Sequence, residues 1–422
     1  MRRIRYLCLV LMLAMLPLEA MGQQTASKHD LNAWVPANTG IETLRVWTLN
    51  AYQDSNGDDV LAAGTDAGVY LSLDAGDTWT AAGLDTSDVS ALVFSNGSLH
   101  AATLADGIFL RENSASAWTP ANSGLENLRV GALSIDQNDV LLASTILGGV
   151  YRSEDNGANW ALAVTSALHD PFVPALVVDA NNDMFAGTDD GVLRSIDGGE
   201  TWSFVNNGLG NLQVESLLLD EDALFAGTDL GMYRSFDNGM NWEAAHTNAL
   251  ATTNVRALVA NNNNAIFAGT LGMGVFRSLD YGTTWEPLNE MLPNLDIAAL
   301  AIADDGTMFA GTVGGGVYRR DAATDVSTES ADVMPATFQL AGNYPNPFAG
   351  STTIRFALPE PAEITLTLFD VTGRIVAVLE NGVKPAGWHE LAFDAAHLPS
   401  GVYFYALKAS DFTAVRHLVL MK

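Results

Sequence analysis

A short motif recurs through most of the chain and constrains its fold more than any other feature. The clearest copy, Ser195 to Trp202, reads Ser-Ile-Asp-Gly-Gly-Glu-Thr-Trp. The same pattern, S-x-D-x-G-x-[TN]-W, fits four more segments: Ser72 to Trp79, Ser153 to Trp160, Ser235 to Trp242 and Ser278 to Trp285, with a degraded sixth copy at Arg111 to Trp118. In such a segment Asp accepts backbone N–H groups, Gly supplies a positive φ, and the flanking residues enter antiparallel strands. The motif therefore predicts a chain of repeated β-hairpins.

The spacing of the repeat predicts its architecture. The tryptophans Trp34, Trp79, Trp118, Trp160, Trp202, Trp242 and Trp285 are separated by 45, 39, 42, 42, 40 and 43 residues. Such intervals are typical of the four-stranded blades of a propeller. A second phrase, an apolar strand that ends in Thr and often precedes Gly-apolar-aromatic, occurs seven times in step, from Thr65 to Thr312. We therefore predict an all-β protein with a seven-bladed β-propeller over residues 31–320.

The two ends of this region predict how the ring closes. The seventh phrase is followed by Gly316-Val-Tyr-Arg319 without another motif or Trp, whereas Trp34 precedes the first blade and has no blade of its own. We expect the segment around Trp34 to supply the outer strand of blade seven, which would leave no free strand edge in the circle.

The motif resembles the Asp-box, or BNR, repeat of sialidases, sortilin-type receptors, xyloglucan hydrolases and photosystem II assembly factors. In these families the box is structural and lies on the face opposite the binding site, and Trp fills the gap between neighbouring sheets. The resemblance implies a structural role for Asp74, Gly76, Trp79, Asp155, Gly157, Trp160, Asp197, Gly199, Trp202, Asp237, Gly239, Trp242, Asp280, Gly282 and Trp285.

The N-terminal segment predicts export. Residues 1–22 combine Arg2, Arg3 and Arg5 with an apolar run and terminal small residues, the three-part pattern of a signal peptide. The chain's single Cys, Cys8, lies in this segment, so we expect no disulfide and no thiol ligand in the mature protein. No later apolar run is long enough to span a bilayer, and no transmembrane segment is expected in the mature chain.

The C-terminal region differs in composition from the repeats. Residues 321–336 are small, polar and acidic, which predicts a linker. Residues 337–422 alternate apolar and polar residues over several short segments, which predicts a small β-sandwich. The opening Asn343-Tyr-Pro-Asn-Pro-Phe348, the D-x-x-G-R turn that ends at Arg374 and the SG-x-Y strand that starts at Ser400 closely resemble the type A sorting domain of type IX secretion.

This second resemblance implies a location and a partner. The protein would pass through the periplasm and be secreted or held on the outer cell surface, with the type IX secretion machinery bound through residues 337–422. One departure from the family pattern is Arg416 in the last strand, where the family leads us to expect Lys.

The charge balance excludes some partners. Acidic residues outnumber basic ones 49 to 20, and there is no Lys between Lys28 and Lys384. Nucleic acid and anionic lipid are therefore poor partners. The acidity would suit a saline medium, calcium binding or solubility alone. Polar turns such as Asp54 to Asp59 mimic half a calcium loop but lack its full ligand spacing and distal Glu, so we predict no metal site and no cofactor.

The chain carries no recognisable catalytic constellation. One repeated position, just before the motif, is occupied by Arg152, Arg194, Arg234, Arg277 and Arg319, and this repeated identity indicates a structural role in each blade. The Arg-Ile-Pro motif of sialidases is missing, and a xyloglucan hydrolase of this repeat class needs two propellers. We therefore predict a non-catalytic binding or interaction protein, with a carbohydrate-active propeller, hydrolase or lyase, as the alternative.

The variable residues of the repeat mark the candidate binding surface. An apolar residue at the start of each inner strand, Val46 in blade one, is constant, whereas its neighbours differ from blade to blade. Neutral variation on solvated loops would give the same pattern, because loops carry both function and tolerated change. From these neighbours we predict a mouth that binds an extracellular glycan or protein through Arg45, Trp47, Arg129, Phe172, Glu215 and Arg256.

Overall fold

The computed structural model describes residues 33–321 and 338–421, apart from 55–56, 113–116, 137, 147, 164–172, 180, 221–222, 247, 262–264, 345–347, 349, 396 and 411. The predicted signal peptide, and the predicted linker beyond its first residue, lie outside these described residues.

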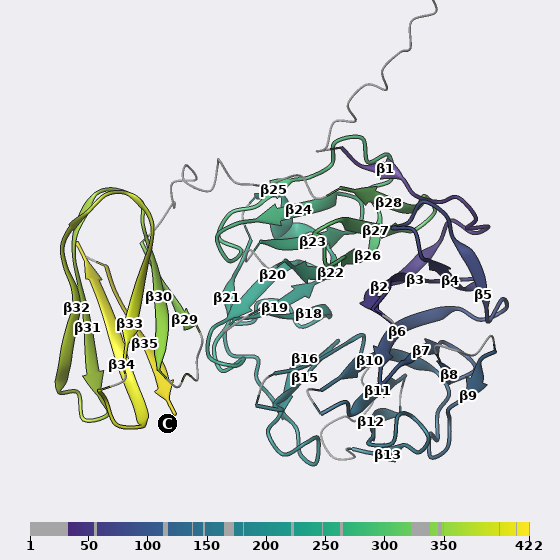
Figure 1. Ribbon diagram of the computed structural model, residues 1–422, viewed down its shortest axis with the longest axis horizontal. Coiled ribbons are helices and arrows are strands. Elements are labelled where there is room, and N and C mark those ends of the chain that lie inside the picture. Colours follow the sequence, from purple (N-terminus) through teal and green to yellow (C-terminus); the bar gives the residue numbers. More distant parts are fainter. Residues whose placement is uncertain are drawn as a thin grey trace, which may run out of the picture.

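Seven four-stranded antiparallel sheets form a ring (Figure 1). Blades 1 to 3 contain β2 (Val46–Gln53), β3 (Asp59–Thr65), β4 (Gly68–Ser72) and β5 (Thr80–Gly83); β6 (Val89–Ser95), β7 (Ser98–Thr103), β8 (Ile108–Glu112) and β9 (Thr119–Pro120); and β10 (Val130–Ile135), β11 (Leu141–Thr145), β12 (Gly149–Ser153) and β13 (Ala161–Leu162). Blades 4 to 6 contain β14 (Ala175–Val178), β15 (Met184–Thr188), β16 (Gly191–Ser195) and β17 (Ser203–Phe204); β18 (Val214–Asp220), β19 (Ala223–Thr228), β20 (Gly231–Ser235) and β21 (Glu243–Ala244); and β22 (Val255–Ala260), β23 (Ile266–Thr270), β24 (Gly274–Ser278) and β25 (Glu286–Pro287), with the 3₁₀ helix η1 (Asn248–Thr252) before β22. Blade 7 contains β26 (Ile297–Ile302), β27 (Met308–Thr312), β28 (Gly316–Arg320) and, from the other end of the propeller, β1 (Val35–Pro36).

The pairing of β1 with β28 confirms the predicted closure. Val35 lies opposite Arg319, and the purple β1 lies beside the green β28 in Figure 1. Trp34 is 1% exposed, and its indole Nε1 donates a hydrogen bond to the carbonyl of Leu288 in blade 6 at 2.6 Å. The side-chain oxygen of Asn38 accepts the backbone N–H of Val317. Both ends of the propeller are therefore joined in one sheet.

Most of the repeated tryptophans join neighbouring blades in the same way. The indole Nε1 of Trp79 donates to Ala37 at 2.8 Å, and that of Trp160 donates to Ala121 at 2.8 Å, in each case to a carbonyl of the preceding blade. Trp202 differs, because its Nε1 donates to Gly199 of its own motif at 3.1 Å. A buried indole with a satisfied N–H adds a large apolar contact without an unpaired polar group.

In five blades the inner strands approach too closely for a side chain at one repeated position, which is Gly there but Ala102 in blade 2 and Ser144 in blade 3. A Cβ on Gly311 of blade 7 would lie 2.7 Å from Cγ1 of Val46 in blade 1, and one on Gly64 would lie 2.6 Å from Cγ1 of Val89 in blade 2. In these five blades the constant apolar residue at the start of the next inner strand fills the space that Gly leaves.

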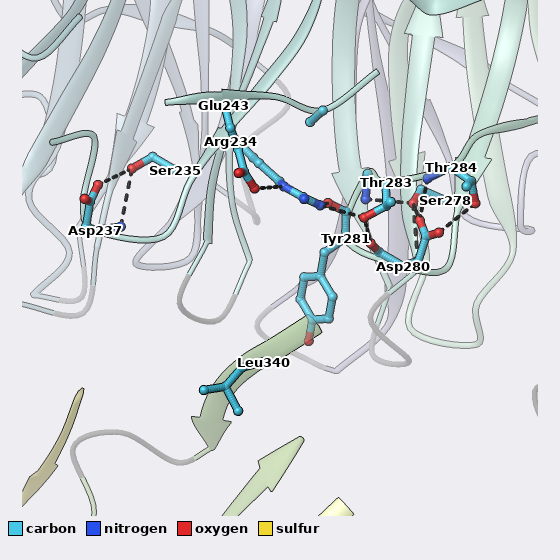
Figure 2. A network of polar contacts seen from close by, with 12 residues as sticks. Arg234, Ser235, Asp237, Glu243, Ser278, Asp280, Tyr281, Thr283, Thr284 and Leu340 are labelled. Atoms are coloured by element: carbon cyan, nitrogen blue, oxygen red, sulfur yellow. Dashed lines mark hydrogen bonds and ion pairs between the residues drawn. The ribbon is translucent and has the colours of Figure 1, made fainter. Parts of the chain in front are cut away.

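The five motif segments form turns with one shared hydrogen-bond pattern. In blade 4 Ser195 Oγ donates to Asp197 at 2.8 Å and accepts the N–H of Gly199 at 2.9 Å, while Thr201 donates its N–H at 2.8 Å and its hydroxyl at 2.6 Å to the same carboxylate. The side-chain hydroxyl and backbone N–H of Thr201, with Ser195, lower the pKa of Asp197 to about 2. Figure 2 shows the corresponding Ser–Asp contacts in blades 5 and 6. The carboxylate therefore stabilises the turn, as the motif predicts.

The repeated arginines make structural contacts. Arg234 of blade 5 donates to the carbonyl of Tyr281 in the motif turn of blade 6 (Figure 2), and Arg319 of blade 7 donates to the carbonyl of Ala75 in blade 1 at 3.0 Å. Arg194 instead pairs with Asp183 of its own blade. Two of these arginines thus join one blade to the motif turn of the next.

The C-terminal region forms a sandwich of two sheets. One sheet has the order β29 (Gln339–Tyr344), β30 (Ser351–Leu358) and β33 (Gly387–Asp394), and the other β32 (Ile375–Lys384), β31 (Ala362–Asp370), β34 (Gly401–Ala409) and β35 (Phe412–Leu420). Ile354, Leu366 and Tyr405 are among its fully buried residues. This domain has its own core, as the alternating pattern predicts.

Candidate ligand-binding site

A β-bulge occurs at the same point of six inner strands. In blade 1 the pairing of β2 with β3 shifts between Val46 and Thr48, so that Trp47 has no partner in the ladder. Equivalent register shifts leave Glu215 in blade 5 and Arg256 in blade 6 without a partner in the ladder. In blades 2, 3 and 7 the residues without a ladder partner are Ser90, Gly131 and Ala298. A bulge changes the direction of one side chain without ending the strand, and bulges are common beside functional sites.

The bulge residues line the central channel of the ring. Its wall is built from three consecutive residues of each blade, beginning with Trp47, Ser90, Gly131, Pro174, Glu215, Arg256 and Ala298, and encloses about 310 Å³. The positions that vary most between the blades are therefore gathered around one opening. We call this opening, lined by these seven residues, the channel mouth.

Four polar residues form a cluster where blades 5 and 6 meet, and two of them, Glu215 and Arg256, line the channel mouth. Glu215 and Arg256 are bulge residues, Asp229 lies in the turn between β19 and β20, and Asn254 precedes β22. The Nδ2 of Asn254 donates to the carboxylate of Asp229. Among the described residues, Nε of Arg256 and Oδ1 of Asn254 are buried atoms without a hydrogen-bond partner. Native proteins leave few buried polar atoms unsatisfied, so these two atoms single out the cluster as a candidate functional position.

The electrostatics of this cluster raise the pKa of one carboxyl group, that of Glu215. Burial raises the pKa of Glu215, the negative charge of Asp229 raises it further, and the positive charge of Arg256 opposes both. A side-chain hydrogen bond with Asp229 also favours the protonated form of Glu215. A perturbed carboxyl group in a cleft, beside a specific charged partner, is typical of functional sites.

The structure gathers only some of the predicted site residues. Trp47, Glu215 and Arg256 line the channel, whereas Arg45 and Arg129 are exposed residues that are not part of its wall. Arg45 forms an isolated bridge with Val313 of blade 7. Phe172 lies outside the described residues. Of the three predicted arginines, Arg256 alone is part of the wall, and it lies near the carboxyl group of Glu215, so the three arginines do not form a local positive site.

Two residues of the cluster were not among the predicted site residues. Asp229 belongs to the turn between the second and third strands, and the variable positions around Val46 contain no signal for it. Asn254 occupies one of those variable positions, but an amide among charged and aromatic neighbours is not distinctive in sequence.

The C-terminal domain matches a known family. Residues 343–421 match the family model described as the secretion system C-terminal sorting domain. No curated protein matches the chain in sequence. The match means that the protein is exported by type IX secretion and is either secreted or displayed on the cell surface. In the part of the chain that the structure describes, no helix has the length and apolarity needed to cross a membrane.

Solved structures similar to this one are propellers. The extracellular domain of the putative one component system BT4673 from B. thetaiotaomicron has a TM-score of 0.56 and 16% identity, over 75% of this chain and 44% of that one. PorZ, a bacterial surface component of the type-IX secretion system of Porphyromonas gingivalis, has a TM-score of 0.54 and 17% identity, over 92% and 61%. YCF48 from Cyanidioschyzon merolae has a TM-score of 0.51 and 15% identity, over 68% and 98%.

These likenesses support the fold alone, and the chain spans about half the length of the first two structures. The propeller fold, its similarity to these structures and the matched tail lead to one description. The chain is an exported all-β protein in which a β-propeller is followed by a C-terminal sorting domain of type IX secretion.

Proposed function

We propose that this protein is a non-catalytic binding protein of the cell surface or the surrounding medium, and that its ligand binds at the channel mouth. The propeller would be an Asp-box propeller with a structural motif face and a ligand-binding mouth. A signal peptide in residues 1–22 would start its export, and the type IX machinery would recognise the tail.

The observation that carries the proposal is the repeated bulge. Six blades keep the same irregularity, and each directs a different residue into the channel. A constant bulge that places variable side chains around one channel is the arrangement that a binding surface on a constant scaffold uses.

The chemistry of the channel mouth suits a polar ligand with an apolar face. Trp47 offers an aromatic surface, the guanidinium of Arg256 offers donors, and the carboxyl group of Glu215 offers an acceptor. Sugar hydroxyl groups both donate and accept, and the face of a sugar ring packs on an aromatic side chain. An extracellular glycan is therefore the ligand class that we favour over a protein.

A second candidate, a carbohydrate-active enzyme, is raised by Glu215 and Asp229. Glycosidases use two carboxyl groups about 5–10 Å apart, with the scissile bond between them. Glu215 and Asp229 are instead joined by a side-chain hydrogen bond, which leaves no room for a sugar between them. This geometry favours ligand binding over hydrolysis.

A glycan array tests the proposal. The purified full chain is applied to the array, and each glycan that binds is titrated by calorimetry and incubated with the protein for product analysis. We expect binding without a cleavage product. Arg256→Ala should weaken binding about tenfold or more, since a charge-assisted hydrogen bond contributes roughly 1.5–3 kcal/mol.

Arg129→Ala is the matched control, because Arg129 is an exposed arginine outside the channel wall. Equal losses in Arg129→Ala and Arg256→Ala would contradict a site in the channel. Release of shorter sugars would favour the enzyme.

A further inference from the structure

The five motif turns differ in how much solvent reaches them. Their shared hydrogen bonds place the motif Asp in equivalent positions, yet Asp280 of blade 6 is 4% exposed, whereas Asp74, Asp155, Asp197 and Asp237 are exposed. The turn itself therefore does not bury Asp280. A part of the protein outside the repeat therefore covers the motif turn of blade 6.

The covered turns carry aromatic residues that the uncovered ones lack. The residue before the motif Asp is Leu73 in blade 1 and Ile196 in blade 4, which are 74% and 72% exposed. In blade 5 this residue is Phe236, which is half-buried. The residue after the motif Asp is Tyr281 in blade 6, which is only 8% exposed.

The C-terminal sorting domain covers both aromatic residues. The guanidinium of Arg416 on β35 lies over the ring of Phe236, 4.2 Å from its centre, and Nε of Arg416 donates to the carbonyl of Leu340 at 3.1 Å. Tyr281 points from the blade 6 turn toward Leu340 on β29 (Figure 2). The contact thus joins two strands of the sandwich to two blades.

Further contacts extend the same interface. Trp388 on β33 packs against the apolar cluster shared by blades 5 and 6, which includes Phe225 and Phe276. The guanidinium of Arg355 lies over the Trp388 ring, 4.5 Å from its centre. Burial raises the pKa of Asp237, but hydrogen bonds from Asn241 and Ser235 and the charge of Arg416 lower it below its ordinary value. Aromatic and arginine side chains are those enriched in protein interfaces.

We propose that the motif turns of blades 5 and 6 form a docking surface for the protein's own sorting domain, with Phe236 and Tyr281 as its anchors and Arg416 as the residue that binds them. An arginine suits this position because its planar guanidinium can stack on an aromatic ring and, at the same time, donate hydrogen bonds in its own plane. The ammonium group of lysine cannot do both. The docked domain lies on the motif turns rather than at the channel mouth. Ligand binding and docking therefore use separate surfaces, and loss of the tail would expose Phe236 and Tyr281.

Hydroxyl-radical footprinting of the full chain, read by mass spectrometry, tests the docking. In the parent protein Phe236 and Tyr281 should be labelled much more slowly than their intrinsic reactivities predict, while Leu73 and Ile196 should be labelled at their intrinsic rates. Arg416→Ala should shift the docking equilibrium about five- to thirtyfold, the value of a partly desolvated cation–π contact, and increase the labelling of Phe236 and Tyr281.

Arg374→Ala is the matched control, since its side chain is 81% exposed on the same domain. Tyr405, fully buried in the sandwich, should stay unlabelled in every variant and so report that the domain is folded. If Arg416→Ala unfolds the domain, Phe236→Leu with Tyr281→Leu replaces it, and small-angle scattering of the full chain should then show a larger maximum dimension. The proposal would be overturned if Phe236 and Tyr281 were labelled at their intrinsic rates in the parent protein. It would also be overturned if these two residues were labelled at equal rates in Arg416→Ala and Arg374→Ala.

Discussion

Replacement of Trp34 by Ala is expected to open the ring. The indole is 1% exposed and packs in a cluster with Val275, Leu288 and Tyr318 from blades 6 and 7. Removal of a buried aromatic side chain costs about 3–5 kcal/mol, and loss of the donor to the Leu288 carbonyl adds about 1 kcal/mol. For a domain of this size each kcal/mol lowers the melting temperature by about 2–4 °C, so the expected fall is roughly 10–20 °C.

The assay is thermal and urea unfolding of the full chain, followed by circular dichroism. Trp79→Ala is the matched comparison, because Trp79 makes the equivalent bond from blade 1 to Ala37 and is 4% exposed. Trp34→Phe keeps most of the ring volume and should cost only about 1–3 kcal/mol. A loss below about 1 kcal/mol in Trp34→Ala, with a large loss in Trp79→Ala, would refute the view that β1 completes blade 7.

Three further predictions concern stability. Gly311→Ala should destabilise the protein by about 1–3 kcal/mol in urea unfolding, because the new Cβ would meet Val46, whereas Gly350→Ala, which has nothing within 4 Å, should have little effect. The folded-state pKa of Asp197, about 2, is below its ordinary 3.8, so its contribution to stability is present above pH 3.8 and is lost as the pH falls toward 2. Asp197→Asn should therefore flatten the acid limb of a melting-temperature profile, and an unchanged limb would contradict the role of the turn. The pKa of Glu215 is raised above its ordinary 4.5, so its ionisation destabilises the fold as the pH rises from that value. Glu215→Gln should raise the melting temperature at pH 7 and reduce its pH dependence, and a lower melting temperature at pH 7 would contradict this reading.

The ring could be predicted from the sequence because its signals are local. Each motif turn contains its own hydrogen-bond donors and acceptors, and the period of the tryptophans gives the size of a blade. Trp34 precedes the first blade and has no blade of its own, and blade 7 lacks a motif with its Trp. These two observations were sufficient to predict that β1 lies beside β28, as the structure confirms.

The site was less accessible to prediction because a bulge is a property of two paired strands. Alternation alone places Arg45 and Trp47 on the same face of a strand, but the bulge at Trp47 breaks the alternation, and Arg45 is not part of the channel wall. The contact between Glu215 and Asp229 joins a strand to a distant turn. The docking of Arg416 on Phe236 joins two domains, and no single stretch of sequence contains it.

Photo-crosslinking at the channel mouth tests the central claim most directly. Trp47 is replaced by p-benzoylphenylalanine in the full chain, and in a separate variant Leu73, in an exposed motif turn, receives the same residue. Each variant is irradiated with the glycan that binds best on the array, and adducts are identified by mass spectrometry. We expect a glycan adduct at position 47 and none at position 73. An adduct at position 73 without one at position 47 would show that the ligand binds the motif face and would contradict a binding site at the channel mouth.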